Sequence, residues 1–117
     1  MNSICIFGVF VADLCFFAEK IPVKGETVLG KNHIIGPGGK GSNQAIAAAR
    51  LGGNVNFISK LGNDDYGKLA IDKLKKNNID ISNIIISNEH KTGVAGIHVD
   101  RNTGKNAITV VRGAPSS

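Results

Sequence analysis

GPGGKGSN, residues 36–43, is the segment on which the interpretation of this sequence depends. It is too glycine-rich for a regular helix or strand, and a helix is predicted directly after it over residues 42–51, capped by Ser42 or Asn43. The backbone N–H groups of such a loop, together with the positive end of the helix dipole, face an oxygen-rich ligand. Lys40 adds a mobile charge, and Asn43 adds an amide that both donates and accepts.

Three interpretations of this loop compete. A P-loop requires glycine at position 34 and Ser or Thr at position 41, but these residues are Ile34 and Gly41, so the spacing excludes it. A dinucleotide-binding loop fits better because Gly36, Gly38 and Gly41 match GxGxxG, although the next predicted strand ends in Lys-Leu rather than in an acidic residue. The third interpretation is a plain tight turn between a strand and a helix.

The flanking sequence predicts an α/β fold. Residues 3–11 (SICIFGVFV) are almost all apolar, which is typical of a parallel strand buried on both faces, and Asp13 is expected to end it. A carboxylate beyond the carboxyl end of a buried strand is where open α/β sheets place ligand contacts. Downstream, Asp64 or Asp65 is predicted to cap a second helix that runs to about Asn77. Further strands are predicted over residues 27–35, 54–61, 84–87, 92–99 and 105–111, the last two as a hairpin.

Composition limits the class of protein. The chain has 117 residues, enough for one domain or part of one, and a net charge of +5 without a basic run, so nucleic acid is not an expected partner. No stretch approaches a membrane span and no convincing signal peptide is present, so a cytoplasmic protein without a membrane partner is expected. Cys5 and Cys15 lie in apolar stretches without metal-ligand spacing, which predicts buried thiols in a reducing compartment and no metal site.

Several motifs, in the same order along the chain, resemble the N-terminal signature of the ribokinase family (PfkB-type carbohydrate kinases). Together they cover essentially all 117 residues. They are Gly8 with Ala12-Asp13, Pro22 with Gly25-Glu26-Thr27, Gly38 to Ala45 (GGKGSNQA), Ala47 to Gly52 (AAARLG), Leu61-Gly62-x-Asp64-x-x-Gly67 and Thr92-Gly93-Val94-Ala95.

This resemblance implies a three-layer Rossmann-like, that is ribokinase-like, α/β sheet with a small antiparallel β lid. Residues 1–117 would be the N-terminal part of a single such domain, and the chain would therefore be truncated relative to the family. The lid strands are expected near residues 14–17, 27–35, 92–99 and 105–111. In many members the lid also makes a dimer contact, so a homodimer through these strands is expected.

The activity implied by the resemblance is the ATP-dependent phosphorylation of a carbohydrate hydroxyl. The residue matching Asp13 binds sugar hydroxyls, and the residues matching Gly39, Lys40 and Asn43 line the same sugar. The chemistry agrees, because a carboxylate accepts hydrogen bonds from two vicinal hydroxyls while ammonium and amide groups donate to others. Ribokinases proper usually carry Asn two positions before this Asp, where the present chain has Val11, so a related furanose, a keto-acid sugar or a nucleoside are alternatives to ribose.

The family's catalytic base lies in a Gly-Ala-Gly-Asp motif near its C-terminus, and neither this motif nor Asn-x-x-Glu occurs in the 117 residues. No catalytic residue, nucleotide site or metal site is therefore expected in this chain, and the chain alone is expected to be inactive. ATP and Mg²⁺ are expected for the full-length enzyme. The alternative functions are a non-catalytic ligand-binding or dimerisation module and a dinucleotide-binding domain.

Overall fold

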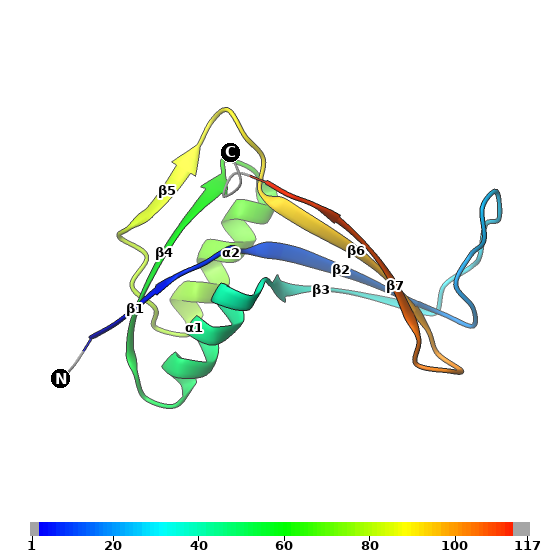
Figure 1. The fold of residues 1–117 in the computed structure, drawn as a ribbon, viewed down its shortest axis with the longest axis horizontal. Helices are drawn as coiled ribbons and strands as arrows, with labels where there is room; N and C mark the ends of the chain where they lie inside the picture. Colours follow the sequence, from blue (N-terminus) through cyan, green and yellow to red (C-terminus); the bar gives the residue numbers. More distant parts are fainter. Residues whose placement is uncertain (1–2, 114–117) are drawn as a thin grey trace.

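The computed structural model describes residues 3–113, which form two β-sheets and two helices (Figure 1). A parallel three-stranded sheet has the order β1 (Ser3–Phe7), β4 (Asn54–Gly62), β5 (Ile84–Ser87). A four-stranded sheet has the order β3 (Asn32–Gly38), β2 (Val11–Ala18), β6 (Gly93–Asp100), β7 (Asn106–Val111). The helices are α1 (Lys40–Arg50) and α2 (Asp65–Lys76). Figure 1 shows the four-stranded sheet extending away from the helices, so the molecule is elongated.

Both helices pack on one face of the three-stranded sheet. Val55 and Phe57 are two residues apart and therefore share a face of β4. Both are buried against Ala45 and Ile46 of α1 and Leu74 of α2. Small side chains in α1 let this helix approach the sheet closely. The packing of two helices on a parallel sheet confirms the α/β fold class predicted from the sequence.

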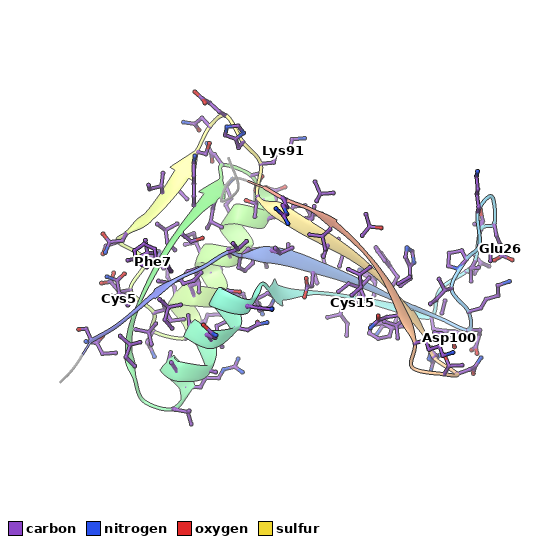
Figure 2. The ribbon with its side chains drawn as sticks, in the orientation of Figure 1. Cys5, Phe7, Cys15, Glu26, Lys91 and Asp100 are labelled. Atoms are coloured by element: carbon purple, nitrogen blue, oxygen red, sulfur yellow. The ribbon has the colours of Figure 1, made fainter. Side chains whose placement is uncertain are left out.

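The opposite face of the same sheet is open. The side chains of Cys5 and Phe7 of β1 lie on this open face, and both are exposed (Figure 2). Phe7 pairs with Ile58 of β4. Phe7 is 77% exposed and Ile85 of β5 is 63% exposed. The prediction of buried cysteines is therefore wrong, since Cys5 is exposed and Cys15 is half-buried.

The prediction of one strand over residues 3–11, buried on both faces and ended by Asp13, is also wrong. The chain leaves the three-stranded sheet after Phe7 and enters the four-stranded sheet at Val11. Between them, a Cβ on Gly8 would lie 2.5 Å from the Cα of Gly41, so only glycine allows this contact between β1 and α1. Asp13 consequently lies inside β2.

The second helix, the short strand and the hairpin are confirmed in place. The strand expected over residues 27–35 instead covers Asn32–Gly38, so the first three glycine-loop residues are part of a strand. Pro37 is tolerated there because β3 is an edge strand. One pair of the predicted antiparallel sheet, β2 with β6, runs parallel. Neither helix in residues 3–113 has the length and apolar character needed to cross a membrane.

Phe7 and Phe57 form a matched pair on opposite faces of the three-stranded sheet. In the 117-residue chain, Phe57→Ala should lower the free energy of unfolding by about 3–5 kcal/mol, since it empties a fully buried site. Phe7→Ala should lower it by less than about 0.5 kcal/mol, since most of that ring already contacts water. Urea unfolding measures both values, and equal losses would contradict the assignment of the open face.

Candidate functional site

The Asp13 carboxylate lies against the glycine-rich segment. In the four-stranded sheet Asp13 pairs with Gly36 of β3 and with Ala95 of β6, and Val11 pairs with Gly38. A Cβ added to Gly38 would lie 2.5 Å from both Cγ and Oδ2 of Asp13, so the carboxylate occupies the space that a side chain at Gly38 would fill. Because Gly38 has no side chain, the Asp13 carboxylate packs against its backbone, next to the start of α1.

This carboxylate has no partner among residues 3–113. It is half-buried, it accepts no hydrogen bond there, and no cation lies within salt-bridge distance. Burial raises the pKa of Asp13 above its ordinary value. A partly desolvated carboxylate without an internal partner retains its full capacity to accept hydrogen bonds from a ligand's hydroxyl groups.

The start of α1 supplies donors next to Asp13. Gly39 is the N-cap residue, with φ of 90°, a conformation that favours glycine. Lys40 and Asn43 are three residues apart in the first turn, so they share a face of the helix, and both are exposed. The first turn carries no acidic residue, so the positive end of the helix dipole is not neutralised within it. Gly39 and Lys40 follow Gly38 directly in the sequence. Because Gly38 packs against the Asp13 carboxylate, both residues lie near this carboxylate.

The predicted cap of this helix is wrong. The helix begins at Lys40 rather than at Ser42, and no side chain caps it. The buried Ser42 hydroxyl instead donates to the carbonyl oxygens of Gly38 and Gly39, one turn earlier. Ser42 therefore shapes the glycine segment from inside the fold, and the exposed Asn43 side chain stays available.

The geometry argues against a dinucleotide site. A dinucleotide-binding unit requires its glycine loop to connect a strand and a helix that lead into the same parallel sheet. Here β3 is an edge strand of the four-stranded sheet, whereas the strand after α1, β4, lies in the other sheet. The GxGxxG match of Gly36, Gly38 and Gly41 therefore lacks the structural context that a dinucleotide-binding loop requires.

One cavity lies elsewhere in the fold, beside the four-stranded sheet. It has a volume of about 460 Å³, and its wall includes Phe16, Ala18 and His98. Phe16 and Ala18 alternate with Asp13 along β2, so this cavity opens on the opposite face of the four-stranded sheet. None of Asp13, Gly39, Lys40 and Asn43 lines it. The candidate site therefore rests on the chemistry of its residues and not on this cavity.

Asp64 joins the two sheets. Its carboxylate accepts hydrogen bonds from the Gly67 N–H (2.8 Å), as the cap of α2, and from the Thr92 N–H (2.9 Å) and hydroxyl (2.8 Å). Thr92 immediately precedes β6, and its hydroxyl also accepts from the Gly62 N–H at the end of β4 (2.9 Å). Figure 2 labels the adjacent Lys91 on the connection that runs from β5 to β6. The start of β6 is thus fixed to β4 and α2.

The hydrogen bonds on Asp64 change its titration. Burial raises the pKa of this carboxyl group, but the donors from Thr92 and Gly67, with the charge of Lys91, outweigh burial and hold the pKa below its ordinary value. In residues 3–113, no three His, Cys, Asp or Glu side chains lie close enough together to bind a metal ion. The described residues therefore do not fit a Mg²⁺ site.

Comparison with known proteins then identifies the family. The profile described as pfkB family carbohydrate kinase matches residues 1–117. The chain belongs to the pfkB family of carbohydrate kinases. The ribokinase of Bacillus subtilis is 41% identical to it over 114 residues, which are 97% of this chain and 38% of that protein.

Solved structures of this family have the same fold. The ribokinase of Giardia lamblia is 31% identical with a TM-score of 0.88, covering 97% of this chain and 37% of that one. The Arabidopsis thaliana ribokinase complexed with ribose and ATP is 32% identical with a TM-score of 0.84, covering 94% and 36%. The chain thus has the ribokinase-like fold and spans little more than a third of the length of these relatives.

Two contacts of this region cannot be read from the sequence. The contact of Gly38 with the Asp13 carboxylate follows from the β2–β3 register, which the sequence does not show. The hydrogen bond from Thr92 to Asp64 cannot be predicted from local sequence, because 28 residues separate the two. The side chains of Val11 and Asp13, two residues apart in β2, lie on one face of the strand.

Removing the Asp64 carboxylate should destabilise the protein. We expect Asp64→Ala to lower the free energy of unfolding by about 1–3 kcal/mol, because it removes a helix cap and leaves the Thr92 donors unpaired. The control Asp65→Ala, in the exposed first turn of the same helix, should cost less than about 1 kcal/mol.

The same variant tests the titration. Because the native pKa of Asp64 is lowered, its contribution is complete above the unfolded value of about 3.9 and is lost as the pH falls through the native value. Urea unfolding at pH 7 and at pH 3 should therefore give a smaller difference between wild type and Asp64→Ala in acid. A difference that stays constant would contradict the role of the ionised carboxylate.

Proposed function

We propose that the protein to which these 117 residues belong is an ATP-dependent kinase that phosphorylates a hydroxyl of a sugar, and that Asp13, Gly39, Lys40 and Asn43 bind this sugar. The observation that carries the proposal is the half-buried Asp13 carboxylate, which has no partner among residues 3–113 and packs against Gly38 beside the start of α1. The relatives named above are ribokinases, and one solved relative is complexed with ribose and ATP.

Each residue has a distinct part in this proposal. The Asp13 carboxylate accepts hydrogen bonds from sugar hydroxyls, while the Gly39 N–H, the Lys40 ammonium and the Asn43 amide donate to sugar oxygens. Such contacts orient the hydroxyl that receives the phosphoryl group, and orientation is a major part of catalysis of phosphoryl transfer. The site residues in this chain therefore act on the sugar, and the catalytic base and nucleotide site belong to a part of the protein outside residues 1–117.

The four-stranded sheet acts in this proposal as a lid over the sugar and as the contact of a homodimer. One row across it, on the Asp13 face, contains only apolar or thiol side chains, namely Ile34, Cys15, Ile97 and Ile108. Ile34 and Ile108, at the two edges, are 52% and 55% exposed. A continuous apolar row of this kind is stabilised when a second copy of the sheet covers it.

Asp13 provides the first test of the function. In the full-length enzyme, Asp13→Ala should lower kcat/KM for the sugar by about 10- to 150-fold, as expected when one or two hydrogen bonds to a charged group are lost. Asp72→Ala, which removes an exposed carboxylate on α2, is the control and should leave kcat/KM unchanged. Coupled measurement of ADP release against sugar concentration gives both values. Unchanged kinetics for Asp13→Ala would refute the site.

Ile108 provides a test of the homodimer. Ile108→Asp places a charge in the apolar row, so the full-length protein should become monomeric by light scattering coupled to size-exclusion chromatography. Thr109→Asp is the control, because its side chain lies on the opposite face of β7. A wild-type protein that is monomeric at all concentrations, or a dimer that persists in Ile108→Asp, would contradict the proposed interface.

A further inference from the structure

The cavity on the face of the four-stranded sheet opposite Asp13 is lined by a row of three rings. Phe16 of β2 pairs with His33 of β3 on one side and with His98 of β6 on the other, so the three side chains share one face of the sheet. The ring centroids of Phe16 and His98 lie 5.7 Å apart, as in other aromatic contacts. All three rings line the cavity, whose volume of about 460 Å³ is that of a small-molecule site. A planar ring can therefore stack against this row.

The connection from β2 to β3, residues 19–31, forms the wall of the cavity. The Lys31 N–H donates to the Phe17 carbonyl oxygen (2.7 Å), which ties the end of the connection to β2. Within the connection, the Lys20 ammonium lies 2.7 Å from the carboxylate of Glu26, which is labelled in Figure 2. These contacts fix the wall, so a ligand does not have to order it on binding.

The charges at the cavity favour an anion. Lys20 and Lys31 both line it, whereas no Asp or Glu of residues 3–113 does. Lys20 shares its charge with Glu26, but Lys31 forms no ion pair within the described part of the chain. Asp100 lies on the same face, and its carboxylate accepts hydrogen bonds from two backbone N–H groups of the adjacent hairpin turn. A ligand in the cavity therefore meets the lysine charges without an opposing carboxylate on the wall.

We propose that this cavity binds a small molecule in which a planar heteroaromatic ring carries a phosphate group, the chemistry of a nucleoside monophosphate. The ring stacks against Phe16 and His98, and the imidazoles can donate to or accept from its heteroatoms. The phosphate, with up to two charges and three acceptor oxygens, pairs with Lys31 and Lys20. The site lies on the face opposite the Asp13 carboxylate and opposite the apolar row of the proposed homodimer, so it is separate from both.

Acetylation of lysine side chains in the full-length protein, measured residue by residue by mass spectrometry, tests this site with AMP as the probe. Saturating AMP should slow the acetylation of Lys31 about 10-fold, because only the uncharged amine reacts and a bound phosphate favours the charged form. Lys24 is exposed on the same connection but does not line the cavity, so its rate should not change. Adenosine or inorganic phosphate alone should protect Lys31 less than AMP, since each supplies only part of the contacts.

Phe16→Ala tests the stacking. It should raise the AMP concentration that half-protects Lys31 by about 5- to 150-fold, the scale of one lost aromatic stacking contact. Ile35→Ala is the matched control and should leave this concentration unchanged. Ile35 lies on the same face as Phe16 and is equally exposed, at 42% against 41%, but it does not line the cavity.

Protection of Lys31 by AMP that Phe16→Ala weakens and Ile35→Ala does not weaken supports the inference. It is overturned if AMP gives no protection, if inorganic phosphate alone protects equally well, if Lys24 is protected to the same extent, or if the protection survives Phe16→Ala. None of these results bears on the proposed kinase function, because the readout is confined to lysines on the face of the sheet away from Asp13.

Discussion

The packing of the Asp13 carboxylate into the space that a Cβ on Gly38 would fill is the constraint on which the candidate site depends. It requires β2 and β3 to pair in one register, and it requires a residue without a side chain at position 38. Because Gly38 ends β3 and α1 begins two residues later, the same register also fixes where the helix starts. The carboxylate, the positive end of the helix and the donors of its first turn are therefore positioned together.

The second requirement is a fixed relation between the two sheets. The four-stranded sheet extends far from the helices, so its orientation depends on the few points where the chain crosses between the sheets (Figure 1). One crossing is secured by the close backbone contact of Gly8 with Gly41, and another by the hydrogen bonds of Asp64 to Thr92. Through these contacts, packing in the three-stranded sheet determines where Asp13 lies relative to α1.

The sequence predicted the helices, the hairpin and the α/β class because periodicity, glycine stops and the Asp64 cap are local signals. The sequence-based predictions fail where tertiary contacts override these local signals. The apolar run of residues 3–11 predicts one strand, but the Gly8–Gly41 contact divides it between two sheets. The glycine content of residues 36–38 (Gly-Pro-Gly) predicts an irregular segment, yet pairing with β2 makes these residues part of a strand. Asp13 lies within β2 and not beyond the end of a strand, so the strand-end argument for it as a ligand contact does not hold, and its role in binding stays a prediction.

The most direct test of the central claim is a crystal structure of the full-length protein with its sugar bound. The account predicts a sugar hydroxyl within about 2.5–3.0 Å of an Asp13 carboxylate oxygen, with the ring beside Gly38 and the first turn of α1. A sugar bound elsewhere, such as in the cavity beside Phe16 and His98 on the opposite face of the four-stranded sheet, with Asp13 contacting no hydroxyl, would contradict it.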